Sequence, residues 1–254
     1  MSEYDPMDQV WQKRLETTEK ALREVSPTFC AAKWQQVTPH LQHGLTPSCH
    51  HPKPHKIPLE GLRENPGLLH NTPFKEEQRQ LMREGQRPAE CEFCWKAEDA
   101  SKDTFSDRVI KSADSWASQD FQSLSNEKNP NPTYLEVSFS NNCNMRCMYC
   151  APEVSSSIWA EYEKFGPYPV GGSYPVEWFD QNSRRPYKLH EENPFVDAFE
   201  KWFPQILPEL KVFRITGGEP LLSAPPVWTL MAVMPGGSAT ASTTSNSSGT
   251  RTSS

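Results

Sequence analysis

The sequence of 254 residues lacks any run of about 18 apolar residues, the length that a transmembrane helix needs. It also lacks an excess of basic residues, since the formal net charge is −6, so the charge balance indicates no nucleic-acid or membrane-surface partner. The N-terminal stretch MSEYDPMDQVWQKRLETTEK is polar and charged and has no apolar core of a signal peptide. We therefore expect a cytoplasmic protein that binds neither nucleic acid nor membranes.

Proline, by contrast, is abundant at 24 residues, which favours long extended connections. The seven cysteines are an odd number, and in a reducing compartment thiols more often serve as metal ligands or catalysts than as disulfides. The pattern predicts five regions: a polar helix at 1–25, a loop-rich cysteine module at 26–100, a polar connector at 101–131, an α/β region at 132–223 and a tail at 224–254. Within the module, FKEEQRQLMREG predicts a helix with Leu81 and Met82 facing inward and Gly85 as its stop.

The α/β region begins with TYLEVSFS at 133–140, which alternates and is rich in β-formers, and so predicts a strand. A second strand is predicted in KVFRITGGEP at 211–220. Between them Asn193 caps a predicted helix whose aromatic residues recur at helical spacing: Phe195, Phe199, Trp202 and Phe203. Strand, helix and strand make a βαβ unit, so the two strands should be parallel and adjacent. Residues 151–190 are too long for a crossover loop, and we interpret them as an insertion over the sheet, either a surface excursion or a substrate-facing lid.

Three cysteines follow the first strand directly, in NNCNMRCMYCAP at 141–152. Cys143, Cys147 and Cys150 have the spacing CxxxCxxC. A structural zinc site has four ligands in a closed tetrahedron, whereas three thiolates leave a metal or a cluster with one open position. A cubane iron–sulfur cluster held in this way has one iron that is open to oxygen and nitrogen donors of a small molecule, which is typical of a catalytic site. A zinc knuckle or a chance cluster of cysteines is the alternative.

A strand, then CxxxCxxC with an aromatic residue before its last cysteine, then a strand that ends in GGEP together resemble the radical S-adenosylmethionine enzymes, over roughly 132–222. The resemblance implies an α/β fold, the start of a partial (β/α) barrel, with the site at the carboxyl ends of the strands. It implies that Cys143, Cys147 and Cys150 hold a [4Fe-4S] cluster whose open iron chelates the amino and carboxylate groups of S-adenosylmethionine.

In that family one electron from the cluster, supplied by a donor such as flavodoxin or ferredoxin, cleaves the sulfonium. The 5′-deoxyadenosyl radical that results abstracts hydrogen from a substrate. By the same resemblance the cofactor-binding residues are Tyr149 by the adenine and, along the methionine end, Gly217, Gly218, Glu219 and Pro220. Glycines at a strand end would let the backbone approach the ligand without a Cβ in the way.

The other four cysteines all lie in the module at 26–100, and four thiolates are the number that closes a site: Cys30, Cys49, Cys91 and Cys94. Spacing alone does not separate structural zinc from an iron–sulfur cluster. A cysteine with a tryptophan four residues on, followed by MREGQRPAECEFC, resembles the twitch and SPASM modules, although those follow the core and this module precedes it. The resemblance implies an auxiliary [4Fe-4S] cluster, which we favour over zinc. His50 and His51 stand beside Cys49, but such histidines are more often solvated or cap a loop.

We therefore expect a radical S-adenosylmethionine enzyme of the twitch/SPASM-like sort, with no catalytic residue identified beyond the cluster ligands. Relatives with auxiliary clusters often modify peptides, so a peptide is the candidate substrate. The alternative is a non-catalytic metal-binding protein, with zinc or an electron-transfer iron–sulfur cluster, or an inactive fragment of such an enzyme. Anaerobic purification and a test for cleavage of S-adenosylmethionine separate the two.

The end of the chain does not continue this pattern. Residues 224–254 contain no Asp, Glu or Lys, and twelve of the seventeen residues at 238–254 are Ser or Thr. Such a segment buries too little apolar surface to offset the entropy of ordering it. Because a barrel needs further β/α units here, we expect that the chain is truncated, or that its native reading is lost near residue 224, and that 224–254 is a disordered or aberrant tail.

Overall fold

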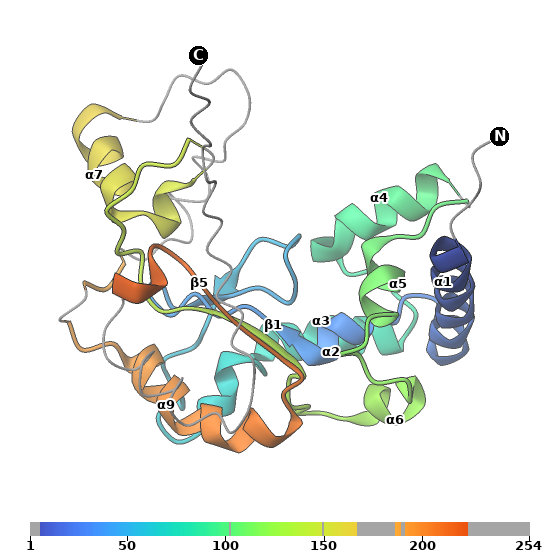
Figure 1. The fold of residues 1–254 in the computed structure, drawn as a ribbon. Helices are drawn as coiled ribbons and strands as arrows, with labels where there is room; N and C mark the ends of the chain where they lie inside the picture. The colour runs from blue at the N-terminus through green and yellow to red at the C-terminus, as the bar shows by residue number, and fades with distance from the viewer. Residues whose placement is uncertain (1–5, 102, 149, 167–185, 189–190, 223–254) are drawn as a thin grey trace, which may run out of the picture.

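The computed structural model describes residues 6–101, 103–148, 150–166, 186–188 and 191–222 (Figure 1). Three parallel strands form a sheet in the order β1 (Gln36–Val37), β4 (Tyr134–Ser138) and β5 (Val212–Thr216). The predicted parallel pairing of the two strands of the α/β region is confirmed, with Tyr134 opposite Val212. The fold is mixed α/β, and the part of the chain described here forms an open sheet and no barrel.

Helix α9 (Pro194–Ile206) covers one face of this sheet, as Figure 1 shows. Its predicted cap is confirmed, because the side chain of Asn193 accepts hydrogen bonds from the backbone N–H groups of Phe195 and Val196. The aromatic stripe is fully buried against the sheet residues that point to the same side, Leu135 and Val137. Burial of this apolar face therefore fixes the βαβ unit.

The first strand, β1, comes from the cysteine module and pairs with β4 in parallel, so that Gln36 lies opposite Tyr134. An isolated bridge extends the contact to His40 and Ser138. The sheet thus crosses the expected boundary between 26–100 and 132–223. Apolar residues of the module share a core with the sheet and α9: Val37, Leu41, Ile57, Leu62 and Leu69.

Six helices of 5 to 20 residues surround a second core in the N-terminal half of the chain. Their bounds are α1 (Pro6–Val25), α2 (Ala31–Gln35), α3 (Pro73–Arg83), α4 (Glu92–Ala100), α5 (Asp107–Ser112) and α6 (Phe121–Asn126). Helix α1 confirms the predicted polar helix. Helix α3 confirms the predicted helix, with Met82 buried and Gly85 just past its end, but Leu81, also expected to face inward, is only half-buried. The connector at 101–131 contains α5 and α6, which pack against α1 and α2 rather than forming a simple linker.

The remaining elements are short. A two-stranded antiparallel ladder joins β2 (Leu45–Thr46) to β3 (His55–Lys56). Helix α7 (Ser156–Phe165) opens the insertion at 151–190, of which residues 167–185, 189 and 190 lie outside the described residues. Turns of 3-10 helix are η1 (Pro66–Leu69), η2 (Ala89–Cys91), η3 (Pro152–Val154), η4 (Leu207–Glu209) and η5 (Pro220–Leu222).

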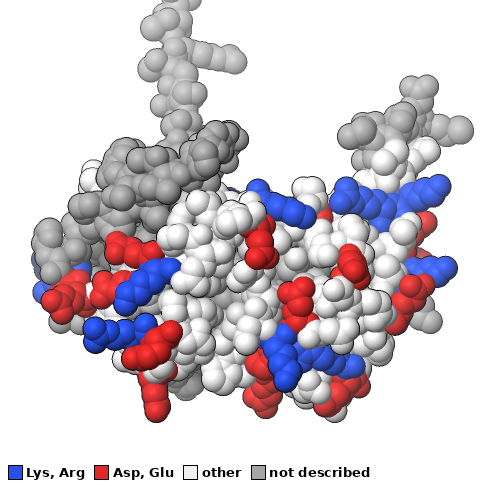
Figure 2. All heavy atoms as spheres, turned by 90° about the horizontal axis from the view of Figure 1, so that it is seen from below, with Lys and Arg blue, Asp and Glu red and all other residues white. Residues whose placement is uncertain are grey.

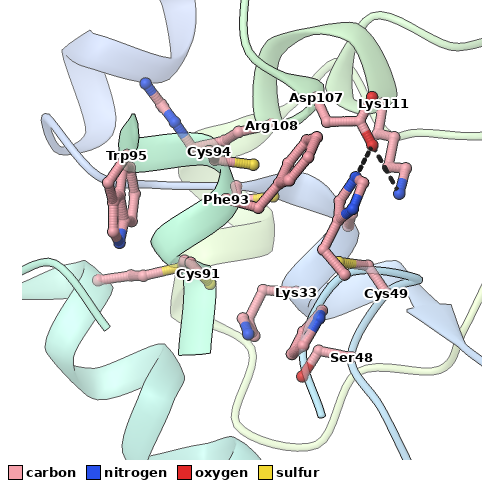
Figure 3. Close-up of a pocket in the computed structure, with 15 residues that line it drawn as sticks. Lys33, Ser48, Cys49, Cys91, Phe93, Cys94, Trp95, Asp107, Arg108 and Lys111 are labelled. Carbon is pink, nitrogen blue, oxygen red and sulfur yellow. Dashed lines mark hydrogen bonds and ion pairs between the residues drawn. The ribbon is translucent and has the colours of Figure 1, made fainter. Parts of the chain in front are cut away.

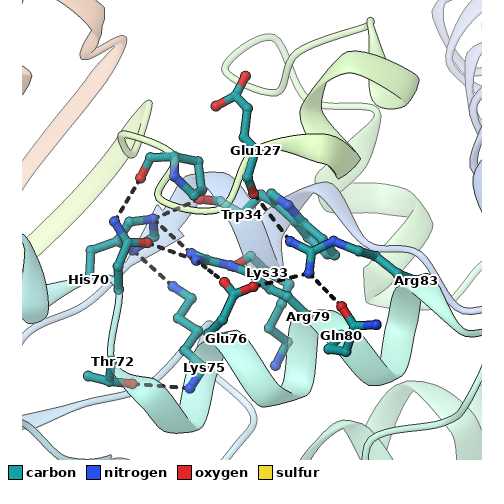
Figure 4. Close-up of polar contacts among 12 residues, drawn as sticks. Lys33, Trp34, His70, Thr72, Lys75, Glu76, Arg79, Gln80, Arg83 and Glu127 are labelled. Carbon is teal, nitrogen blue, oxygen red and sulfur yellow. Dashed lines mark hydrogen bonds and ion pairs between the residues drawn. The ribbon is translucent and has the colours of Figure 1, made fainter.

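A buried basic cluster on and before α3 fixes the segment that joins α2 to β1 (Figure 4). Lys75 Nζ donates to the carbonyl oxygen of Gln36 at 2.9 Å and contacts His70 Nδ1 at 3.0 Å. Arg79 Nε donates to the carbonyl oxygen of Lys33 at 3.1 Å, and His70 Nε2 lies 2.7 Å from that of Trp34. These side chains satisfy carbonyl groups at the C-terminal end of α2, where a helix leaves its acceptors unpaired and favours cations.

Charged side chains of both signs are interspersed on the face drawn in Figure 2, without a large patch of one sign. Within the described residues, no helix combines the length and the apolar character that crossing a membrane requires.

Candidate metal centres

The loop with three cysteines and the GGEP segment lie side by side, because each follows the carboxyl end of one of two adjacent parallel strands. The backbone N–H of Gly218 donates to the carbonyl oxygen of Ser140 at 3.2 Å, and that of Glu219 donates to the carbonyl oxygen of Asn142 at 2.7 Å. These bonds continue the pairing of β4 and β5 beyond the strands. Cys143 and Gly217 are 74 residues apart in the sequence, and these hydrogen bonds bring their two motifs together into one site.

Both glycines of GGEP are required by this close approach. Gly217 has a φ of +105°, and a Cβ there would lie 2.7 Å from the carbonyl oxygen of Ser140. A Cβ on Gly218 would lie 2.7 Å from the carbonyl carbons of Asn141 and Asn142. We expected the missing Cβ atoms to leave room for a ligand. On this side of both glycines, the chain's own backbone fills that room instead.

The three cysteines of the loop form no disulfide and are partly exposed. The backbone N–H of Met145 donates to Cys143 Sγ at 3.4 Å, and the N–H of Cys150 donates to the carbonyl oxygen of Cys147 at 2.9 Å, which closes a turn. Met148, between the last two cysteines, is fully exposed. Tyr149 lies outside the described residues.

Three consecutive serines hold the loop from the N-terminal end of α7. Ser156 Oγ accepts a hydrogen bond from the backbone N–H of Cys143 at 3.1 Å, and Ser157 Oγ donates to the carbonyl oxygen of Cys143 at 2.6 Å. Ser155 caps the helix by accepting from Ile158 N, and it also contacts the carbonyl oxygen of Met145 at 3.4 Å. Sequence reasoning missed these anchors, although a serine run before a helix is a recognisable cap signal.

The other four cysteines converge on one narrow cavity of about 20 Å³ (Figure 3). Cys30 is the N-cap residue of α2, Cys91 and Cys94 lie one turn apart at the start of α4, and Cys49 comes from the loop after β2. All four line this cavity, which we call the four-thiol cavity, and all are free thiols. The grouping that the count of four suggested is thus present in the structure.

Burial raises the pKa of the Cys91 and Cys94 thiols to about 12, and also raises that of Cys30. The other thiols raise these pKa values further, whereas the charges of Lys33 and Arg108 lower the pKa of Cys30. Backbone hydrogen bonds from Lys33 to Cys30 and from Arg108 to Cys94 act in the same direction. The thiols of Cys30, Cys91 and Cys94 therefore stay protonated in isolation, and a bound cation is what would convert them to thiolates.

Three cations surround the four-thiol cavity, each paired with a carboxylate. Lys33 pairs with Glu90, Arg108 Nε with Glu98 at 2.9 Å, and Lys111 with Asp107 at 3.0 Å. At the mouth, His51 stacks on Phe93 with ring centroids 3.7 Å apart.

One buried donor, Arg108 Nη2, has no hydrogen-bond partner within the described residues, and Arg108 lines the cavity.

Among the described residues, no group of three or more His, Cys, Asp or Glu side chains forms a site for a single metal ion. Comparison with protein-family models, curated proteins and solved structures finds no match.

Proposed function

We propose that the chain carries the cluster-binding part of a radical S-adenosylmethionine enzyme. One observation supports this most strongly: the CxxxCxxC loop and the GGEP segment follow adjacent parallel strands and are tied by the hydrogen bond from Glu219 N to the carbonyl oxygen of Asn142. In parallel α/β proteins, sites form at this end of the strands. Chance cysteines or a zinc knuckle would have no reason to lie beside this second motif.

In this proposal Cys143, Cys147 and Cys150 hold a [4Fe-4S] cluster, which supplies the electron that cleaves S-adenosylmethionine to the 5′-deoxyadenosyl radical. The chain's own residues position the loop. Ser156 and Ser157 hold the backbone of Cys143, and the turn from Cys147 to Cys150 sets the spacing of the last two thiols. Gly217 and Gly218 bring the second strand end against the loop. The electron comes from a flavodoxin or a ferredoxin.

The four-thiol cavity takes an auxiliary [4Fe-4S] cluster in this proposal, with zinc as the alternative. Four thiols from three separate elements support a closed site. Because the cavity is narrow in the present arrangement, loading a cubane requires these thiols to turn outward. Zinc would also require the thiols to move, because no three described side chains form a site for a single metal ion in the present arrangement, so metal analysis decides between them.

A second candidate function is a non-catalytic metal-binding protein. The four-thiol cavity favours this function, because four thiols are the number of ligands that a structural zinc ion takes. The test is anaerobic reconstitution followed by electron paramagnetic resonance of the reduced protein, with and without S-adenosylmethionine. Binding at an open iron changes the spectrum, and the variant with Cys143, Cys147 and Cys150 all replaced by Ala does not show the change. A spectrum that S-adenosylmethionine leaves unchanged in the native chain, or zinc without iron, supports the second function instead.

A further inference from the structure

A second cavity, of about 440 Å³, lies over the face of the sheet opposite α9. We call it the sheet-face cavity. Its floor contains Glu136 and Ser138 of β4 and Thr216 of β5, and one wall is the loop at 47–54, which carries Cys49. Val154, four residues after Cys150, contributes to another wall, and His51 lines both this cavity and the four-thiol cavity. The sheet-face cavity is therefore bounded by segments from both groups of cysteines.

The floor is unusual for a parallel sheet. Such sheets are normally covered by apolar side chains on both faces, yet Glu136, Ser138, Arg214 and Thr216 all project from this one. Ser138 is fully buried and Thr38 is 5 % exposed, and both line the cavity. Their hydroxyl oxygens have no hydrogen-bond partner within the described residues. Residues that line a cavity and carry a hydroxyl without a partner indicate a place for a polar ligand.

The charged group of the floor is Glu136. Tyr134 donates a hydrogen bond to its Oε2 at 3.1 Å, and Arg214 Nη1 lies 3.6 Å from that same oxygen. The other oxygen, Oε1, has no donor among the residues described. Arg214 also donates to the hydroxyl of Tyr134 at 3.1 Å, so the three side chains form one fixed triad.

The basic-type side chains around the cavity offset this carboxylate only in part. Burial lowers the pKa of His40 to about 4, so His40 is neutral near pH 7, and burial also lowers the pKa of His50. His51 pairs with Asp107, and Lys53, which also lines the cavity, is exposed. The cation paired with the carboxylate, Arg214, is half exposed and lies on the side of Oε2. The lining thus presents a carboxylate oxygen and two unpartnered hydroxyls, which suit a hydrogen-bond donor that is also positive.

We infer that the sheet-face cavity binds the substrate, and that the substrate presents an amino group to Glu136, with the hydroxyls of Thr38 and Ser138 as further partners. The volume is that of a site for a small molecule or for one side chain of a peptide. The substrate role rests on the proposed function, because it places the amine-bearing group between the two cysteine sites. The binding of an amine does not depend on it.

The experiment is titration calorimetry of the full chain with Nα-acetyl-lysine amide, and with Nα-acetyl-glutamine amide as the neutral comparison. We expect the lysine compound to bind at least about 10-fold more tightly, and Glu136→Gln to remove most of that difference. Thr38→Val is isosteric and removes an unpartnered hydroxyl, so it should keep the fold and weaken binding. Glu209→Gln, which changes a carboxylate bonded to Asn131 far along the chain, is the control and should bind as the native chain does.

Equal binding of the two compounds by the native chain, no binding of either, or lysine binding unchanged in both Glu136→Gln and Thr38→Val would overturn the inference. The unfolding transition of each variant is recorded alongside, so that Thr38→Val decides the matter if Glu136→Gln does not fold. Failure of the native chain to cleave S-adenosylmethionine would refute the proposed function and leave this calorimetric result standing, so the two failures are distinguishable.

Discussion

The backbone N–H of Glu219 donates a 2.7 Å hydrogen bond to the carbonyl oxygen of Asn142, the residue before the first cysteine of CxxxCxxC. This bond joins the ends of β4 and β5, which pair in parallel along their whole described length. Because the backbones of the two segments touch at this point, there is no room for a side chain between them. The glycines of GGEP therefore have a structural duty besides any contact with a ligand.

Replacement of Gly218 by alanine should destabilise this junction. The new Cβ would lie against the backbone of Asn141 and Asn142, and overpacking of this kind costs about 1–3 kcal/mol. Urea unfolding measures the loss. Gly67→Ala is the matched control, because its Cβ would meet a side-chain oxygen of Asn65 at 3.1 Å and no backbone atom. An unfolding midpoint for Gly218→Ala equal to that of Gly67→Ala would contradict the close packing.

Lys75→Met should destabilise the N-terminal half of the chain. The amine is fully buried and serves both the carbonyl oxygen of Gln36 and His70 Nδ1. Leaving these buried acceptors unpaired costs about 1–3 kcal/mol, and part of this is offset because burial disfavours the charge of Lys75 and lowers its pKa. Lys96→Met, on an exposed turn of α4, should change the unfolding free energy by less than about 0.5 kcal/mol. Equal effects of the two substitutions would show that the buried cluster contributes nothing.

Lowering the pH should destabilise the protein even at pH values above the range in which carboxylates titrate. Burial lowers the pKa of His55 to about 3 and of His40 to about 4, and His70 is lowered for the same reason and by the charge of Lys75. In the unfolded chain histidines bind protons near pH 6.5, whereas these three stay neutral when folded. Their contribution is complete above about pH 6.5 and is lost as the pH falls toward the folded values, by up to about 1.4 kcal/mol per pH unit for each.

Urea unfolding at pH 7.5 and at pH 5 checks this slope. His55→Gln removes one of the three groups and should make the difference between the two pH values smaller. An unfolding free energy that stays constant between pH 7.5 and pH 5 would show that these histidines are not buried in the neutral form.

The four-thiol cavity should keep its metal when the other site is removed. In the variant with Cys143, Cys147 and Cys150 replaced by Ala, we expect one [4Fe-4S] cluster per chain after anaerobic reconstitution, because the remaining thiols line one cavity. Adding Cys30→Ala and Cys94→Ala should remove that iron. Iron and sulfide analysis with parallel zinc determination gives the answer. Zinc at one per chain with no iron in the first variant would replace the auxiliary cluster by a structural zinc site.

The sequence predicted the elements that are long enough to show their period. The alternation of 133–140 and the aromatic spacing of Phe195, Phe199 and Trp202 extend over several turns or residue pairs, so the βαβ unit could be predicted. Strand β1 spans only Gln36–Val37 and pairs with a segment about a hundred residues away, which no local pattern reveals. Helices α5 and α6 have six residues each, too few for a periodic signal.

The candidate sites divide in the same way. The cysteines could be predicted as metal ligands from the sequence, because cysteine is a rare residue type and the spacing within each group is local. The sheet-face cavity could not, because its floor and its wall at 47–54 come from distant parts of the chain and meet only in three dimensions. In the sequence, Glu136 is only one position of an alternating strand. Its place in a triad with Tyr134 and Arg214 depends on the pairing of β4 with β5. The predictions for Tyr149 and for 224–254 concern residues outside the described part and stay predictions.

We propose that three thiolates in one loop hold a [4Fe-4S] cluster, which would supply the electron that generates a radical from S-adenosylmethionine. The most direct test of this central claim is the amount of 5′-deoxyadenosine formed anaerobically with a strong reductant, compared among the native chain, the variant with Cys143, Cys147 and Cys150 replaced by Ala, and Met148→Ala. Met148 is fully exposed within the same loop, so its variant controls for disturbance of the loop itself. The account predicts 5′-deoxyadenosine from the native chain and from Met148→Ala and none from the triple variant. Formation by the triple variant, or no formation by the native chain, would contradict it.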